Sequence, residues 1–159
     1  MIPQRKPSAG TSYQIEAFSS CVFEIARHAK AHWDEFGARK DIRKLDVDWE
    51  TYLRADRVGR IVLATVRTEA GRLIGYLAMA MHPDFHDRNA LAAESVVYYV
   101  EKRPMRGLIQ RNLIRFMRDH LLASGVKYQR ISSEIAHGNN SILRNCGYEP
   151  TSVFYTLKG

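Results

Sequence analysis

The stretch of sequence that decides the fold is "VVYYVEKRPMRGLIQRNLIRFM", residues 96–117. A β-branched and aromatic run comes first, a group of cations around Gly107 follows, and apolar residues then recur at helical spacing. This order predicts a strand that turns directly into a helix. Cations oppose the positive end of a helix dipole, whereas the free N–H groups there bind anions. We therefore interpret Arg106 and Gly107 as part of a phosphate-binding turn. A solvated basic face is the simpler interpretation of each arginine farther along the helix.

The composition is that of one soluble globular domain. The chain has 159 residues, of which 45% are hydrophobic and 26% charged. We expect residues 1–10 to form a flexible arm and residues 11–159 to form a single domain. The net charge of +7 indicates attraction to anions, but it does not distinguish nucleic acid, an acidic protein surface and a phosphorylated cofactor.

The sequence also predicts a compartment. No apolar run is long enough to span a membrane, and the N-terminal cations are not followed by the apolar segment of a signal peptide. Two cysteines without C-x-x-C spacing indicate reduced thiols. We therefore expect a cytoplasmic protein with no membrane partner.

Hydrophobic periodicity predicts an α/β domain with a mixed sheet. The predicted elements are a helix of residues 11–36, a short helix after Asp48, a hairpin of residues 60–81, a strand of residues 91–100, a helix from Arg106 to Gly125, a strand of residues 126–135, a short helix closed by Gly147 and a strand of residues 151–158. If the strands on either side of the Arg106 helix are parallel, they form a β-α-β unit. The helix N-terminus then lies at the carboxyl edge of the sheet, where such folds bind ligands.

Two segments resemble the GNAT superfamily of N-acetyltransferases, and the layout from about Gly59 onward resembles its short, often phage-encoded members. The family's turn, commonly written "V-x-P-x-x-R-G-x-G-x-G", is matched in "VEKRPMRGLIQR" by Arg106 and Gly107. The family's "N-x-x-A-x-x-L-Y-x-K-x-G-F" is similar to "NNSILRNCGY". The resemblance implies a GNAT-like fold: a mixed, mostly antiparallel sheet with a parallel β-α-β unit and helices on both faces.

Three positions depart from the family pattern. Ile109 and Arg111 stand where the family usually has the second and third glycines of its phosphate loop, so side chains occupy positions where backbone would approach a pyrophosphate. Leu143 stands where a tyrosine often acts as the general acid. In the family, backbone carries most of the coenzyme binding, so these substitutions need not abolish it.

The resemblance implies acetyl-CoA as co-substrate. In the family, the strand equivalent to residues 96–100 parts from the strand equivalent to residues 131–135, and the pantetheine arm lies in the gap. The residues that this arrangement would bring to the coenzyme are Tyr98, Tyr99, Val100, Arg106, Gly107, Leu108, Ile109, Gln110, Arg111, Asn139 and Asn140. We expect no metal site, because the histidine pairs of the sequence have no third ligand in pattern.

Glu94 is the best-placed carboxylate for a general base. It lies in an apolar strand, where partial burial would make it a better proton acceptor near neutral pH; an outward-facing, solvated Glu94 is an equal alternative. His137 is a weaker candidate, and Tyr155 could replace the missing acid, although packing is its more usual role. We interpret Cys146, at a helix C-terminus, as a core residue.

The acceptor side is less specific. The first two helices form the acceptor wall in the resembled superfamily, and the loop after residue 82 would form a mouth. The candidate substrate-binding residues are therefore His32, Trp33, Glu35, His82 and His86. A tryptophan at a helix end is more often a core lid, and a lone histidine is more often structural.

Two functions from different classes remain open. The first is an acetyl-CoA-dependent N-acetyltransferase acting by direct transfer on a primary amine of a small molecule, a protein or a modified nucleobase. The second is a catalytically degenerate domain of the same fold that binds an anionic macromolecule through its basic surface. The lack of an exposed aromatic residue among the cations around Arg106 favours the first, because bases would find no stacking platform. The oligomeric state, a homodimer included, is not indicated.

Overall fold

The computed structural model describes residues 10–36, 44–133, 140–153, 155 and 157. The elements are β1 (Thr11–Glu16), α1 (Phe18–Phe36), α2 (Trp49–Arg57), β2 (Ile61–Thr68), β3 (Leu73–Pro83), β4 (Leu91–Val100), α3 (Arg106–Ala123), β5 (Val126–Arg130) and α4 (Asn140–Asn145). They form a five-stranded sheet in the order β1-β2-β3-β4-β5. The first four strands are antiparallel and β5 is parallel to β4, which confirms the predicted mixed sheet and its parallel unit.

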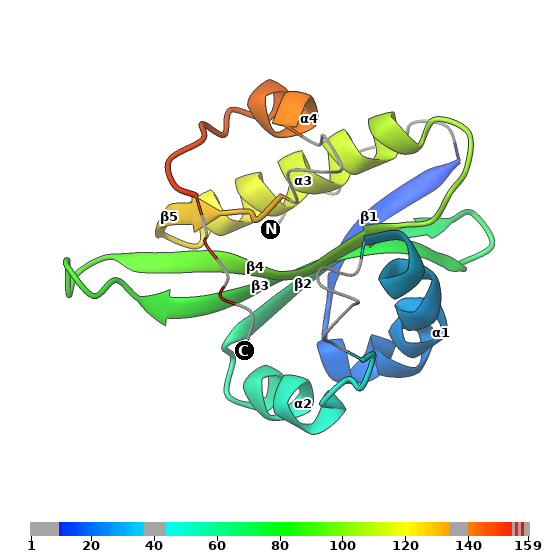
Figure 1. Ribbon diagram of the computed structural model, residues 1–159, viewed down its shortest axis with the longest axis horizontal. Helices are drawn as coiled ribbons and strands as arrows, with labels where there is room; N and C mark the ends of the chain where they lie inside the picture. The colour runs from blue at the N-terminus through cyan, green and yellow to red at the C-terminus, as the bar shows by residue number, and fades with distance from the viewer. Residues whose placement is uncertain (1–9, 37–43, 134–139, 154, 156, 158–159) are drawn as a thin grey trace.

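The helices cover both faces of the sheet, as predicted. Figure 1 shows α1 and α2 on one face and α3 and α4 on the other. Each face has its own hydrophobic cluster: Phe18 and Ile25 of α1 pack over one, and Leu113 and Met117 of α3 pack over the other. The predicted apolar face of α3 is buried along its length, and Gly125, with φ +84°, follows its end.

The N-terminal prediction was wrong, because residues 11–16 form strand β1 and not the start of a helix. Thr11 and Tyr13 are buried, and β1 pairs with β2 along its whole length. The helix begins only at Phe18, where the backbone N–H groups of Phe18 and Ser19 donate to the two carboxylate oxygens of Asp56 at 3.1 and 3.0 Å. Asp56 belongs to α2, so the residue that caps α1 is distant in sequence. Ile15 and Phe18 are three positions apart, which is also the spacing of a helical repeat, and the prediction therefore extended the helix too far toward the N-terminus.

The predicted C-terminal elements were also partly wrong. β5 ends at Arg130 instead of residue 135, and the described residues of the predicted last strand, 151–153, 155 and 157, are exposed and not in a strand. Their β-branched and aromatic residues therefore gain no sheet partner, since strand propensity is expressed only where packing supports it.

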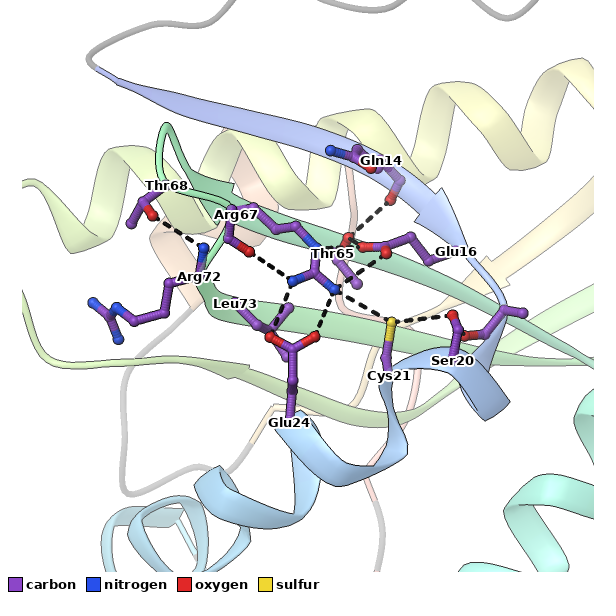
Figure 2. A network of polar contacts seen from close by, with 12 residues as sticks. Gln14, Glu16, Ser20, Cys21, Glu24, Thr65, Arg67, Thr68, Arg72 and Leu73 are labelled. Atoms are coloured by element: carbon purple, nitrogen blue, oxygen red, sulfur yellow. Dashed lines mark hydrogen bonds and ion pairs between the residues drawn. The ribbon is translucent and has the colours of Figure 1, made fainter.

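One arginine joins three elements around β1. Arg67 of β2 donates to Glu16 of β1 at 2.8 Å, to Glu24 of α1 at 2.9 Å and to the carbonyl of Gly71 at 2.8 Å (Figure 2). Thr65 also donates to the Glu16 carboxylate. Burial acts to raise the pKa of Glu16, but hydrogen bonds from Arg67 and Thr65 outweigh it and the pKa is lowered. This network fixes α1 against the edge of the sheet that β1 forms.

Candidate active site

The two parallel strands part at a defined position. β4 pairs with β5 from Leu91 to Glu94, opposite Val126 to Arg130, and beyond Glu94 it pairs only with β3 among the described residues. The N–H group of Ser132 donates to the hydroxyl of Ser95 at 2.9 Å, just past this point. The backbone edge of residues 95–100 that faces away from β3 therefore has no strand partner in the described part of the chain. This is the gap that the family resemblance implied.

A β-bulge lies at the point of separation. Met79 of β3 is opposite Ser95 and Ala78 is opposite Val97, so Val96 is the extra residue of β4. A bulge reverses the alternation of side chains and bends the strand. As a result, Glu94, Val97 and Tyr99 all face α1 and α2, opposite the even-numbered residues of β3. Glu94, the predicted base, therefore lies on the face of the sheet that α1 and α2 cover.

A cavity of about 420 Å³ lies on that face between α1, α2 and the sheet. Five aromatic residues contribute to its lining: Phe18, Trp33, Trp49, Tyr52 and Tyr76. Val96 and Val97 of the bulge also line it. The cavity therefore reaches β4 from one face of the sheet at the place where the gap to β5 opens.

The turn into α3 is closed mainly by its own backbone, because the N–H groups of Arg106 and Leu108 donate to the carbonyls of Arg103 and Met105 at 3.3 and 3.0 Å. Met105 at its N-cap has the left-handed conformation, with φ 60°, and no side chain caps the helix. A Cβ atom added at Gly107 would meet nothing within 4 Å, so the backbone there is open. Ile109 and Gln110 are buried, and Ile109 belongs to the core under α3. The side chain of Ile109 therefore points into the protein and does not cover the N-terminus of the helix.

Four of the predicted site residues meet at one place. Arg106 of α3 forms an ion pair with Glu35 of α1, with 3.2 Å between Nη2 and Oε2, and its guanidinium lies 5.9 Å from the ring centre of Tyr99. His32 stacks on Tyr99 with ring centres 5.1 Å apart. Burial lowers the pKa of His32 to about 4, so this imidazole is neutral near pH 7. The charge of Arg106 is thus compensated by a carboxylate in this structure.

Glu94 is held in a second cluster. Arg130 of β5 donates from Nη1 to Glu94 Oε1 at 2.7 Å, and Nε2 of His82 lies 3.7 Å from the same oxygen. The Glu94 side chain is 46% exposed, so it is half solvated and not enclosed. The structure therefore brings Glu94 and His82 together, while the exposed loop with His86 extends away from α1 (Figure 1). Neither histidine is among the described residues that line the aromatic cavity.

The other predicted residues have different surroundings. Tyr98 and Val100 face α3, and the hydroxyl of Tyr98 is buried with no hydrogen-bond partner among the described residues; burial raises the pKa of this phenol. Leu108 lines a small cavity beside α3, and Arg111 is partly buried. Tyr155 is 93% exposed. Asn140 begins α4, and His137 and Asn139 lie outside the described residues.

Two arginines of the basic helix have a structural role that the sequence interpretation missed. Arg115 donates to the carbonyl of Asn145 and Arg118 to that of Cys146, each at 2.8 Å, so they bind the last carbonyls of α4. Cys146 is fully buried, as predicted, and burial raises the pKa of its thiol. One signal in the sequence could have indicated this role. The two arginines lie on one helical face, and a short helix followed by Gly147 comes later in the chain.

The aromatic residues of α2 were also missed. Trp49 and Tyr52 line the cavity, yet the sequence interpretation gave the short helix no site residue. Their spacing of three places them on one face of a helix that has an Asp48 N-cap, accepting from the N–H of Thr51 at 3.0 Å. That pattern predicts a helix with one aromatic face but not what the face contacts.

Comparison with solved structures gives clear similarities of fold at low sequence identity. An aminoglycoside acetyltransferase from an uncultured soil metagenomic sample is 14% identical over 96% of this chain and 100% of its own, with a TM-score of 0.70. A ribosomal-protein-alanine N-acetyltransferase from Brucella melitensis biovar Abortus 2308 is 12% identical over 94% and 97%, with a TM-score of 0.72. Glucosamine-6-phosphate N-acetyltransferase from Arabidopsis thaliana is 14% identical over 93% and 97%, with a TM-score of 0.66. The chain therefore has the fold of the GNAT acetyltransferases.

The sequence comparisons give no match. No family model matches the chain, and no curated protein is significantly similar to it. Within the residues that the structure describes, no group of three or more histidine, cysteine or acidic side chains could hold a metal ion. No helix in that part of the chain has both the length and the apolar character that a membrane span requires.

Proposed function

We propose that this protein transfers an acetyl group from acetyl-CoA to a primary amine by direct attack. The observation that carries the proposal is the separation of β4 from β5 beyond Glu94, at a bulge that an aromatic cavity reaches from the other side. Two substrates could thus approach the same strand segment from opposite sides of the sheet. The GNAT fold of the chain supports this assignment.

The backbone at the gap suits acetyl-CoA. The backbone edge of residues 95–100 that faces away from β3, which pairs with no strand in the described part of the chain, can hydrogen-bond the amides of the pantetheine arm, and the open backbone at Gly107 can bind the pyrophosphate. Ile109, which replaces a family glycine, turns its side chain into the core, so this departure does not obstruct the site. Tyr98, Tyr99 and Val100 would lie along the arm.

The reaction requires a neutral amine and a polarised thioester. The amine nitrogen attacks the carbonyl carbon, the N–C bond forms, the C–S bond breaks, and the thiolate of coenzyme A accepts a proton. Backbone N–H groups at the Val96 bulge would stabilise the negative charge that develops on the carbonyl oxygen. We assign to Glu94 the removal of the ammonium proton, either directly or through a water molecule.

The competing proposal, binding of an anionic macromolecule, loses support from the structure. The net charge of +7 is its main argument. However, Arg67 and Arg106 are engaged by carboxylates, and Arg115 and Arg118 are engaged by carbonyls of α4. These four side chains, of 24 lysines and arginines in the chain, are therefore not part of a free basic surface, and we favour the transferase.

Calorimetric titration with acetyl-CoA tests the coenzyme site. We expect saturable binding by the natural protein, weaker binding by Gly107→Ala and a loss of about tenfold or more by Gly107→Val, because added bulk covers the open backbone. Alanine at this position should not lower the midpoint of urea unfolding, since the added Cβ atom has free space in a helix. Absence of binding by the natural protein would refute the proposal.

A further inference from the structure

We propose that the acceptor is a small amine attached to a flat aromatic ring, which binds in the cavity lined by Trp33, Trp49 and Tyr52. This inference rests on the proposed function and specifies its second substrate. It is drawn from three properties of the cavity: its walls, its charge and its position.

The walls are aromatic on more than one side. Trp33 comes from α1, Trp49 and Tyr52 come from α2, and Tyr76 comes from the sheet. Tyr52 stacks on Phe18 with ring centres 4.9 Å apart and planes at 12°, which holds its ring in a fixed orientation. A flat aromatic ring can make offset-stacked or edge-to-face contacts with these rings on more than one side of the cavity. The volume of about 420 Å³ is near the lower end of the ~300–1,000 Å³ typical of small-molecule sites.

The charge of the lining is opposite to that of the protein. Apart from the tyrosines, which are neutral near pH 7, the ionisable side chains among the lining residues are Lys44, Asp46, Asp48 and His32. His32 is neutral near pH 7, so the formal charges are two negative and one positive, giving −1 in a chain of net charge +7. Asp48 is held in place by donation from Thr51 Oγ1 at 2.6 Å. Such a lining attracts an ammonium group and disfavours a phosphorylated amine.

The position of the cavity connects it to the reaction. Val96 and Val97 line it, and they lie at the bulge where the thioester carbonyl would be bound. Glu94 faces the same side of the sheet. A ring between Trp33 and α2 would therefore direct its amine side chain toward the bulge and the proposed base.

Intrinsic fluorescence tests the inference directly, because both tryptophans of the chain line this cavity. The probe is 2-phenylethylamine, for which we expect a saturable change in tryptophan emission. Two matched probes each remove one property: 2-phenylethanol lacks the charge, and 2-cyclohexylethylamine lacks the flat ring. Glucosamine 6-phosphate, the third probe, has a sugar ring instead of an aromatic ring and carries a phosphate. Each should bind about threefold to tenfold more weakly or not at all.

Two variants separate the contributions. Trp49→Ala should weaken 2-phenylethylamine binding about tenfold, with Trp33 still reporting. Asp46→Asn should weaken binding of the amine about threefold but leave 2-phenylethanol unchanged, because only the amine is charged. The control Asp119→Asn changes a charge on α3, away from the cavity, and should have no effect on either probe.

The outcomes distinguish the inference from the proposed function. If acetyl-CoA binds and the enzyme acetylates glucosamine 6-phosphate in preference to 2-phenylethylamine, the acceptor class is wrong and the transferase proposal stands. If 2-phenylethylamine binds in the cavity but acetyl-CoA binding is absent, the transferase proposal fails and the ligand class stands. If 2-phenylethylamine produces no saturable change in emission, the inference is overturned.

Discussion

Arg106 at the first turn of α3 and Glu35 near the end of α1 form an ion pair that joins helices on opposite faces of the sheet. Their side chains are only 19% and 17% exposed. The pair connects the turn proposed to bind coenzyme phosphate with the helix that borders the acceptor cavity. A change at either residue should therefore affect both stability and coenzyme affinity.

Arg106→Ala should lower the free energy of unfolding by about 2 kcal/mol, because it leaves the Glu35 carboxylate poorly solvated and unpaired. The double variant Arg106→Ala/Glu35→Ala should lose less than the sum of the single variants, as measured by urea unfolding. Glu35→Gln should lower the dissociation constant of acetyl-CoA, because it frees the Arg106 charge for a phosphate. An unchanged dissociation constant in both Glu35→Gln and Arg106→Ala would mean that the backbone alone binds the coenzyme.

Loss of Arg67 should destabilise the protein more than loss of Arg72, the arginine of a second ion pair. Arg67→Ala removes the partner of Glu16 and Glu24 at a side chain that is 14% exposed, and we expect a loss of about 3 kcal/mol in the free energy of unfolding. Arg72→Ala is the control, because Arg72 pairs with Glu101 while 59% exposed. Its loss should stay below about 1 kcal/mol. Equal losses would contradict the structural role assigned to Arg67.

His32 predicts a dependence of stability on mildly acidic pH. Burial lowers its pKa from 6.5 to about 4 in the folded protein, so the unfolded state binds the proton more readily. Its contribution is present above pH 6.5 and is lost as the pH falls toward 4, by about 3 kcal/mol in total. His32→Phe should remove this part of the pH dependence of Tm. Hydrogen bonds from Arg67 lower the pKa of Glu24, and at lower pH, as the carboxylates of Glu24 and Glu16 become protonated, both proteins should lose stability.

The sequence correctly predicted the helices and strands whose hydrophobic pattern and end signals lie within their own segment. The α3 helix, the β2–β3 hairpin and the β4 strand have clear local patterns, glycines mark the end of α3 and the hairpin connection, and the parallel placement of β5 follows from the order of the elements. β1 was missed because its identity depends on pairing with β2, and the start of α1 was missed because its cap, Asp56, comes from another helix. Strand 151–158 was predicted from propensity and from the family resemblance, and its described residues have no strand partner.

The candidate site likewise combines residues that a local motif indicates with residues that only tertiary packing brings together. The turn at Arg106 and Gly107 was predicted as a site from its motif, and Glu94 from its place in the strand. The Arg106–Glu35 pair spans 71 positions, and the aromatic face of α2 meets the cavity only through tertiary packing, so neither could be derived from spacing. The bulge at Val96 leaves no recognisable pattern in the sequence, yet it determines which face Glu94 occupies.

Tyr98 is a candidate to protonate the departing thiolate in place of the family tyrosine that Leu143 replaces. Its hydroxyl is buried without a hydrogen-bond partner in the described part of the chain, and burial raises its pKa, so the phenol retains its proton. Tyr98→Phe removes an unsatisfied buried group and should leave stability unchanged or slightly higher. If the phenol supplies the proton, kcat should fall by about tenfold or more while the dissociation constant of acetyl-CoA stays the same. An unchanged kcat would assign this proton to solvent.

Glu94→Gln tests the proposed base. The substitution keeps the size of the side chain and its ability to accept a hydrogen bond from Arg130 but removes proton acceptance. Because Glu94 and Arg130 are 46% and 55% exposed, the stability cost should be below about 1 kcal/mol, so a kinetic defect is not a folding defect. The rate of acetyl transfer near neutral pH should fall by about 10²-fold.

The pH profile distinguishes a base from a positioning residue. Above the pKa of the acceptor amine the substrate is already neutral, so the defect of Glu94→Gln should shrink as the pH rises. His82→Gln is the matched comparison, because His82 lies 3.7 Å from Glu94 and is the nearest other proton acceptor in the described cluster. If the rate defect of His82→Gln shrinks as the pH rises while Glu94→Gln keeps the natural rate, His82 is the base. A loss in Glu94→Gln that is equal at every pH would mean that the carboxylate orients the acceptor and that water removes its proton.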